Sequence, residues 1–374
     1  MKKLIDICDI QYGYAFDSKY FTENSLYPPL VRIRDVKRGY SETYYSGDYP
    51  EEYILAAGDL LVGMDGEFNI ARWKSDGALL NQRVCKLTAK NGINEEYLRF
   101  AMSKSLKEIE EKTAFVTVKH LSAKELSRLK IYVPELSKQN KIAGILSCIE
   151  RIINVRRQEI EKFDELIKAR FVEMFGAYPQ NPMGWEICTI RDIVTDVRYG
   201  SSRPAVDGGK YPYLRMNNIT YDGELDLSDI KCIDVPDNEL DKCTVRRGDV
   251  LFNRTNSKEL VGKTCVYNRD EMMVLAGFVI RVRVNNRILP EFLSAFLNTD
   301  FSKQMLLGMC KTAIGQANIN ARELQDIRLY LPPVELQWRY VQFKKQTDKS
   351  KVAVQKSLDK TQQLFDSLMQ KYFG

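Results

Sequence analysis

The chain has 374 residues, a mean hydropathy of −0.35 and 28% charged residues, which together exclude wholesale disorder and residence in a membrane. Its 56 basic and 50 acidic residues leave a net charge of +6, too small to indicate nucleic acid binding by itself. Eight scattered cysteines without a CxxC pair and a single histidine, His120, exclude zinc spacing and histidine triads. Together with a start that lacks a signal peptide pattern, these cysteines predict a cytoplasmic protein.

The first part of the chain, residues 1–137, contains short alternating runs such as 30–33, bounded by glycine, proline and aspartate. Period-two patterns of this kind predict strands, and a helical stretch near 95–111 interrupts them. Residues 138–176 then carry an apolar heptad pattern without proline, which predicts one long helix. Glycine and proline residues directly after it predict the end of the helix and a domain boundary.

The second part of the chain has the same organisation. Residues 177–335 contain a strand-like run at 274–284 and a helical stretch near 290–309. Residues 336–374 again predict one long helix, with a weaker heptad pattern. The four predicted segments therefore alternate between a mixed α/β domain and a long helix.

An internal repeat explains this alternation. Residues 126–176 align without a gap on residues 324–374 at a constant offset of 198. Upstream, Gly58-Asp59 matches Gly248-Asp249, with a different offset because the intervening loops differ in length. Since the two helices occupy the same place in each repeat, the simplest burial pairs them with each other. The predicted fold is α/β: two tandem mixed α/β domains, each followed by a long helix, with the helices paired as an antiparallel coiled coil.

The heptad pattern also predicts which side chains lie in the helical contact or dock a partner. These are Ile142, Ile149, Ile153, Phe163, Ile167, Tyr340, Val354, Leu358, Phe365 and Leu368.

Catalytic motifs are incomplete in this sequence. Residues 261–264 read Val-Gly-Lys-Thr, but Ser257 stands where a phosphate-binding loop needs glycine. Asn181-Pro182 resembles part of an adenine methyltransferase signature, yet no glycine-rich cofactor loop accompanies it. We therefore predict no catalytic residue, no metal ligand and no cofactor for this chain.

Side chains suited to reading DNA gather between the predicted strands of both repeats. Arginine matches guanine edges, asparagine and glutamine match adenine edges, and lysine matches phosphates. For any one of these residues an ordinary solvated surface is an equal alternative, and only the clustering in both repeats favours DNA. The candidates are Arg32, Arg34, Lys37, Arg38, Arg72, Arg83, Lys119, Arg203, Arg215, Asn217, Asn218, Arg254, Asn256, Lys258, Gln316 and Asn318.

The whole layout resembles the DNA specificity subunit of Type I restriction-modification systems. The resemblance rests on the tandem unit, on the repeated Gly-Asp strand, on residues 312–320 leading into 331–337, and on both helices ending in Phe-Gly. It implies a target recognition domain at 1–137, a spacer helix at 138–176, a second recognition domain at 177–335 and a second spacer helix at 336–374.

The resemblance also implies partners. Two adenine methyltransferase subunits would dock on the helices and bring S-adenosylmethionine, and each recognition domain would read one half of a bipartite double-stranded DNA site. A nuclease subunit using ATP and magnesium would join in some complexes.

Two alternatives stay open at this point. One is a specificity subunit of a methylation-only system. The other is a coiled-coil adaptor that binds proteins and not DNA, which the low net charge favours slightly.

Overall fold

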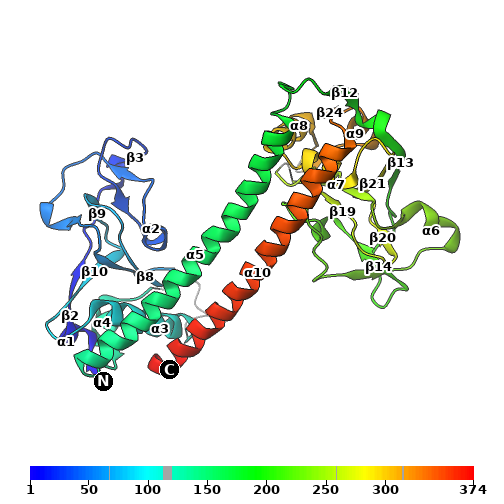
Figure 1. The fold of residues 1–374 in the computed structure, drawn as a ribbon. Coiled ribbons are helices and arrows are strands. Elements are labelled where there is room, and N and C mark those ends of the chain that lie inside the picture. The colour runs from blue at the N-terminus through cyan, green and yellow to red at the C-terminus, as the bar shows by residue number, and fades with distance from the viewer. Residues whose placement is uncertain (67, 113–119, 258, 314–315) are drawn as a thin grey trace. The chain divides into compact units, whose positions relative to one another are not determined.

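The computed structural model describes residues 1–374 except 67, 113–119, 258 and 314–315 (Figure 1). The chain forms two compact units. The first unit comprises Met1–Gln158 and Val354–Gly374, and the second comprises Glu159–Ala353. Each unit therefore contains one mixed α/β domain and a stretch of each long helix.

The first unit is built on a four-stranded antiparallel sheet with the order β2-β10-β7-β8. These strands span Cys8–Tyr12, Val84–Ala89, Leu60–Gly63 and Asn69–Arg72. Three small sheets accompany it: β4-β9-β6 (Leu30–Val31, Ala78–Leu80, Ile54–Leu55), β1-β11 (Lys2–Lys3, Lys130–Ile131) and β3-β5 (Phe21–Thr22, Tyr44–Tyr45). The helices of this domain are α1 (Leu4–Ile7), α2 (Ile33–Arg38), α3 (Glu95–Lys112) and α4 (Ala123–Arg128).

The alternation along β7 explains the layers of this unit. Because successive side chains of a strand point to opposite faces, Leu60 and Val62 pack on one side and Leu61 on the other. Leu60 and Val62 share a core with Tyr97 and Phe100 of α3. Leu61 belongs to a second core with residues of the small β4-β9-β6 sheet.

The second unit repeats this plan. Its main sheet is four-stranded with the order β13-β21-β17-β19 (Val194–Tyr199, Val279–Val284, Val250–Asn253, Thr264–Val266), again antiparallel throughout. The small sheets are β15-β14-β20-β16 (Lys231–Ile233, Tyr211–Leu214, Met273–Leu275, Thr244–Val245), β12-β24 (Glu186–Thr189, Arg328–Leu331) and β18-β23-β22 (Thr255–Asn256, Gln316–Asn318, Lys311–Ala313). The helices are α6 (Asp237–Cys243), α7 (Pro290–Leu297), α8 (Asp300–Met309) and α9 (Ala321–Gln325).

A repeated Tyr-Gly pair has a steric role in both units. A Cβ atom on Gly13 would lie 2.1 Å from the carbonyl oxygen of Asn81, and one on Gly200 would lie 2.1 Å from that of Leu275. Only glycine allows the chain to pass so close to the neighbouring strand as it leaves β2 or β13. The Tyr-Gly pair occurs in both units because the chain makes the same close approach to a neighbouring strand in each of them.

The two long helices are α5 (Leu136–Phe175) and α10 (Val334–Phe373), each of 40 residues. In the first unit, Arg156 of α5 donates a hydrogen bond of 2.8 Å to the Ser357 carbonyl of α10. In the second unit, Lys351 Nζ lies 2.5 Å from Asp164 Oδ1. Later residues of α5 thus contact earlier residues of α10, so the helices are antiparallel. The predicted fold class is confirmed, whereas the four-segment domain bounds stay a prediction.

The predicted contact residues of these helices are buried to different degrees. Ile142, Ile149, Ile153, Tyr340 and Leu358 are buried. Phe163, Ile167, Val354, Phe365 and Leu368 are partly buried. All ten side chains are at least partly covered by the rest of the chain, and their docking of a partner stays a prediction.

Among the described residues, none of the helices is both long enough and apolar enough to cross a membrane.

Candidate nucleic-acid interface

A hollow of about 640 Å³ opens beside α2 in the first unit. Four residues of α2 and three from the end of β7 to the start of β8 line this α2 hollow: Ile33, Arg34, Lys37, Arg38, Asp65, Gly66 and Asn69. Among the described residues, the lining contains three basic side chains and one carboxylate. Three of the predicted DNA-binding residues meet here.

Local sequence explains why α2 presents these cations. The backbone N–H of Arg32 donates a 2.9 Å hydrogen bond to Asp35 Oδ2, which closes the start of the helix. Gly39 ends it in the left-handed conformation, with φ of 75°. Asp35 and Val36 are buried, so the remaining face, with Arg34 and Arg38 four residues apart, is exposed.

The two arginines of α2 have weak carboxylate partners. Arg34 lies 3.6 Å from Asp35, whose carboxylate already accepts the Arg32 N–H, and Arg38 lies 3.9 Å from Glu42. Asp65, the acid among the described residues of the lining, instead contacts Arg83 at 3.3 Å and the ring of His120. Because Arg83 contacts Asp65, it lies next to the α2 hollow.

Arg72 lies elsewhere and has another role. Its guanidinium contacts Glu95 at 2.8 Å and also Glu96, both in the first turn of α3, and it donates a 2.6 Å hydrogen bond to the Gly58 carbonyl. With three partners inside the domain, Arg72 joins β8 to α3. These contacts favour a structural role for it.

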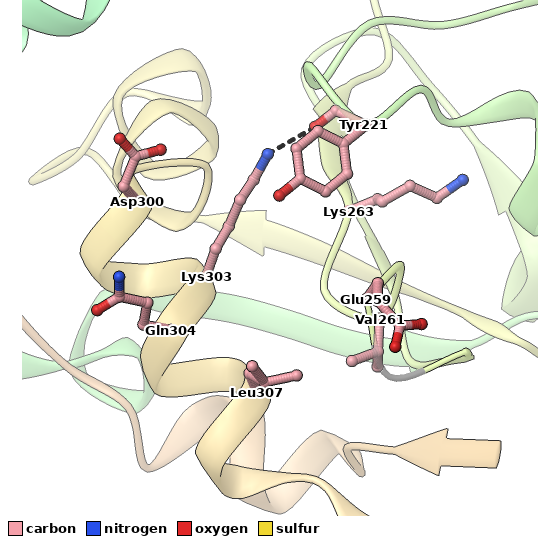
Figure 2. Close-up of a pocket in the computed structure, with 8 residues that line it drawn as sticks. All are labelled: Tyr221, Glu259, Val261, Lys263, Asp300, Lys303, Gln304 and Leu307. Atoms are coloured by element: carbon pink, nitrogen blue, oxygen red, sulfur yellow. Dashed lines mark hydrogen bonds between the residues drawn. The ribbon is translucent and has the colours of Figure 1, made fainter. Parts of the chain in front are cut away.

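The second unit has a hollow of about 460 Å³ beside α8 (Figure 2). This α8 hollow is lined by Tyr221, Glu259, Val261, Lys263, Asp300, Lys303, Gln304 and Leu307. Lys303 Nζ lies 3.4 Å from the centre of the Tyr221 ring and donates a 2.8 Å hydrogen bond to the Tyr221 carbonyl. Burial lowers the pKa of both Lys303 and Lys263.

Several predicted DNA-binding residues of the second unit have internal partners. Arg203 contacts Glu239 at 2.9 Å, and Arg215 contacts Asp229 at 2.9 Å. Asn218 is buried, accepts the Arg215 N–H and donates to the Asp226 carbonyl. It therefore shapes the turn Met216–Asn218 (η4) and does not reach a base in this conformation.

The remaining candidates lie around β18 and β23. Arg254 stacks over Tyr199 at 4.9 Å and donates a 3.2 Å hydrogen bond to the Gly277 carbonyl. Asn318 Oδ1 accepts a hydrogen bond from the Thr255 hydroxyl, and Asn256 Oδ1 accepts from the Ser257 N–H. Asn217 is exposed within η4. Lys119, Lys258 and the Gln316 side chain lie outside the described residues.

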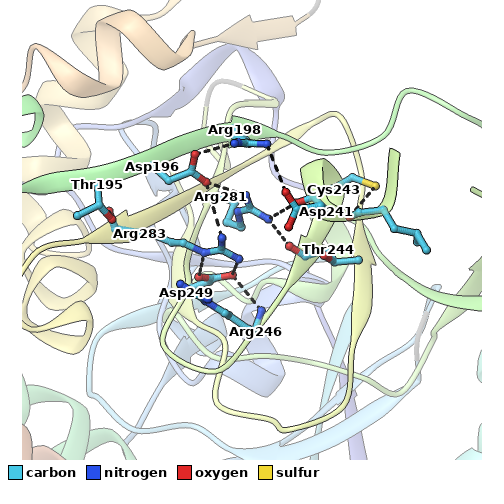
Figure 3. A network of polar contacts seen from close by, with 11 residues as sticks. Thr195, Asp196, Arg198, Asp241, Cys243, Thr244, Arg246, Asp249, Arg281 and Arg283 are labelled. Carbon is cyan, nitrogen blue, oxygen red and sulfur yellow. Dashed lines mark hydrogen bonds and ion pairs between the residues drawn. The ribbon is translucent and has the colours of Figure 1, made fainter. Parts of the chain in front are cut away.

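A network of charged side chains supports the sheet of the second unit (Figure 3). Arg281 is 1% exposed and contacts Asp196 at 2.7 Å. Arg283 contacts Asp249, the aspartate of the repeated Gly-Asp pair, at 2.8 Å. Asp249 also accepts the Arg246 N–H at 2.9 Å. No local sequence pattern predicts this network, because Arg281 and Arg283 lie in an otherwise ordinary strand pattern.

Exposed apolar side chains form a different set from the buried contact residues of the helices. On α5 they include Ile152, Val155, Leu166 and Val172, and on α10 they include Trp338, Val352 and Leu364. Leu166 and Leu364 are related by the repeat offset of 198 and are 48% and 50% exposed. The same surface feature thus occurs once on each helix.

The described residues contain no cluster of three or more His, Cys, Asp or Glu side chains that could hold a metal ion. All eight cysteines are free thiols, and burial raises the pKa of Cys8 to about 12.

Comparison with known proteins identifies the family. The model of the Type I restriction modification DNA specificity domain matches residues 1–162 and 182–364, once for each repeat. The chain belongs to this family. The paired matches show that the internal repeat consists of two such domains.

Two curated relatives agree with this assignment. The specificity subunit of the Type I restriction enzyme EcoBI from Escherichia coli is 28% identical over 98% of this chain and 84% of its own length. The EcoKI specificity subunit of E. coli K12 is 23% identical over 70% of this chain and 60% of its own length.

Two solved structures share the fold. The S subunit of a Type I restriction-modification system from M. genitalium superposes with a TM-score of 0.59 and 15% identity, covering 100% of this chain and 95% of that one. A chain from a study of complex assembly and conformational transition in the Type I system has a TM-score of 0.59 and 20% identity, covering 100% of this chain and 96% of that one. Family membership favours DNA specificity over the coiled-coil adaptor.

Proposed function

We propose that this specificity subunit reads a bipartite double-stranded DNA site, with one half read by each α/β domain. The observation that carries the proposal is the duplication itself: the same sheet order occurs twice, and a hollow lies beside each copy with different side chains. A shared scaffold with two different linings is what two unlike half-sites require, because base identity is read by side chains and not by the sheet.

The proposed partners are two adenine methyltransferase subunits. Leu166 and Leu364 support this number, because repeat-related exposed leucines offer the same apolar contact twice. The methyltransferase would supply S-adenosylmethionine and the catalytic residues, and this chain would supply none. Where a nuclease subunit joins the complex, ATP and magnesium would belong to that subunit.

The test is a genome-wide map of N6-methyladenine in a host that co-expresses this chain with its methyltransferase. We expect a split motif, two short half-sites around a fixed gap, that is modified only when this chain is present. The control is the same host with the methyltransferase alone. Methylation that is independent of this chain, with the methyltransferase shown to be active, would overturn the proposal.

The methylation-only alternative differs in partners and not in this chain. It predicts the same split motif without cleavage of unmodified DNA. Copurification of a nuclease subunit and restriction of unmodified phage would contradict it.

A further inference from the structure

Strands β4 and β14 have the same neighbours in their respective units. β4 pairs in parallel with β9, which pairs antiparallel with β6. β14 pairs in parallel with β20, which pairs antiparallel with β16. The last residues of the two strands, Val31 and Leu214, lie opposite Leu80 and Leu275, and all four are buried. Val31 and Leu214 are therefore structurally equivalent.

The turn that follows each of these strands is closed by the same pair of hydrogen bonds. The Arg32 N–H donates to Asp35 Oδ2, and the Asp35 N–H donates to the Arg32 carbonyl, both at 2.9 Å. The Arg215 N–H donates to Asn218 Oδ1, and the Asn218 N–H donates to the Arg215 carbonyl, again both at 2.9 Å. Asp35 and Asn218 are 1% and 2% exposed. A buried side chain thus fixes the backbone of residues 32–35 and of residues 215–218 in the same way.

The third position of these two turns is exposed in both units but differs in chemistry. It is Arg34 in the first unit and Asn217 in the second. The second position, Ile33 or Met216, is apolar and partly buried in both. The third position therefore places two different polar side chains at equivalent places on the two surfaces.

Arginine and asparagine match different base edges. An arginine donates two hydrogen bonds to O6 and N7 of guanine, and an asparagine makes two hydrogen bonds with N6 and N7 of adenine. The Arg34 side chain is 55% exposed, and its contact with Asp35 is 3.6 Å long, which is beyond hydrogen-bond distance. Among the described residues, the Asn217 side chain has no hydrogen-bond partner. Both side chains are therefore available to a base.

We propose that the third turn position is a base-reading position of each domain, at which Arg34 reads a guanine in one half-site and Asn217 reads an adenine in the other. The inference rests on the proposed function, because it names side chains that read the two half-sites. The closed turn fixes the backbone from which the side chain extends. Exchanging that side chain therefore exchanges the base without moving the domain.

The experiment maps N6-methyladenine in the host that co-expresses this chain with its methyltransferase, for wild type, Arg34→Ala and Asn217→Ala. We expect Arg34→Ala to accept other bases in place of one guanine, on either strand of one half-site. Asn217→Ala should do the same for one adenine of the other half-site. Methylation rates of the purified complex on duplexes that differ only at that base pair should show discrimination reduced roughly 10- to 100-fold.

Asn217→Arg tests the equivalence of the two positions. This variant carries the side chain of the first unit on the turn of the second, so it should change the accepted base from adenine to guanine. Thermal unfolding establishes that the variant folds. A folded variant that still requires adenine would overturn the inference, and where the larger side chain abolishes methylation, the result for Asn217→Ala decides.

Two matched controls alter nearby exposed positions. Arg38 lies one turn later on α2 and is 48% exposed, and Ser228 is exposed in the connection between β14 and β15. Arg38→Ala removes the same charge as Arg34→Ala, and Ser228→Ala shortens a polar side chain in the second unit. Both controls should keep the wild-type base at every position of the motif.

The remaining outcomes separate this inference from the proposed function. An unchanged motif in Arg34→Ala and Asn217→Ala, or the same relaxation in a control, would overturn the base-reading role. So would a uniform loss of methylation at all sites by folded variants, because a phosphate contact weakens binding without regard to base sequence. Methylation that does not depend on the wild-type chain would instead count against the proposed function.

Discussion

Gln139 of α5 and Gln337 of α10 make the same set of hydrogen bonds in their respective units. Gln337 Nε2 donates to the Pro332 and Arg287 carbonyls at 2.8 and 3.2 Å, and its Oε1 accepts the Leu289 N–H at 2.8 Å. Gln139 makes the equivalent bonds to Pro134, Gly92 and Asn94 at 2.8, 3.1 and 2.9 Å. Each glutamine fastens the start of a long helix to its α/β domain.

Replacing Gln337 by Ala should lower the free energy of unfolding of the second unit by about 2 kcal/mol, because a buried N–H and two carbonyls lose their partner. Gln139→Ala should do the same to the first unit. Denaturant unfolding measures both. Gln355→Ala, at an exposed position of α10, is the control and should change stability by less than about 0.5 kcal/mol. Equal effects at all three positions would contradict the fastening role.

The ion pair of Asp196 and Arg281 predicts a pH dependence. Burial raises the pKa of Asp196, but hydrogen bonds from Arg281 and Arg198 outweigh burial and hold this pKa below its usual value. A carboxyl whose pKa is lower in the folded state stabilises the fold above its unfolded pKa, and the contribution is lost as pH falls through the folded value. Unfolding free energies should therefore drop below about pH 4.

Asp196→Asn tests this assignment. The variant should be less stable at pH 7 by about 2 kcal/mol and should lose less stability than wild type on acidification, since it has no carboxylate to protonate. Asp237→Asn, which removes a carboxylate 3.9 Å from Lys210, should keep the wild-type pH profile. Parallel profiles for wild type and Asp196→Asn would show that this carboxylate does not carry the acid sensitivity.

The contact between Asp164 and Lys351 reports the antiparallel pairing in the second unit. Asp164→Lys and Lys351→Asp should each destabilise this unit, because like charges then face each other. The double exchange should recover most of the loss, with a coupling of up to about 1 kcal/mol for a pair at 43% and 30% side-chain exposure. Thermal unfolding of the four proteins measures the coupling. Strict additivity would mean that the two side chains do not meet in solution.

Exposed leucines on the two helices predict the methyltransferase stoichiometry. Leu166→Asp and Leu364→Asp should each remove one of two bound subunits, and the double variant should bind neither, because a carboxylate cannot be buried in an apolar contact. Native mass spectrometry counts the subunits. Ser350→Asp places the same charge at another exposed position of α10 and should leave two subunits bound. Two subunits retained by both leucine variants would exclude these contacts.

Helix length predicts the gap between the half-sites. An α-helix rises about 1.5 Å per residue, so one added heptad lengthens α5 by roughly 10 Å. The insertion after Ile153 must be matched opposite it in α10. The repeat-equivalent position is Lys351, but this residue does not lie opposite Ile153. In the antiparallel pair, Lys351 contacts Asp164, and Arg156 contacts both Ser357 and Thr361. The matching heptad therefore belongs after Thr361, where it preserves the register on both sides.

With both insertions in place, the methylation map should show the same half-sites around a longer gap. Seven alanine substitutions at exposed positions of α5, which leave its length unchanged, should keep the gap. An unchanged gap in the insertion variant would exclude helix length as the determinant of spacing.

The sequence by itself determined the duplication and the two long helices. These features follow from local periodicity and from an offset of 198 residues, which are properties of the chain alone. Family membership was also accessible at this level, because the repeated elements occur in a recognisable order.

Only the tertiary structure decided which polar residues have internal partners. Arg72 and Arg34 look alike in sequence, but folding brings the α3 carboxylates of Glu95 and Glu96 to Arg72, while Arg34 stays exposed beside the α2 hollow. Likewise, Ile153 and Leu166 both fit the heptad pattern, yet the first is buried and the second is 48% exposed. The physical reason is that hydrogen bonding and burial depend on neighbours distant in sequence, which local patterns do not contain.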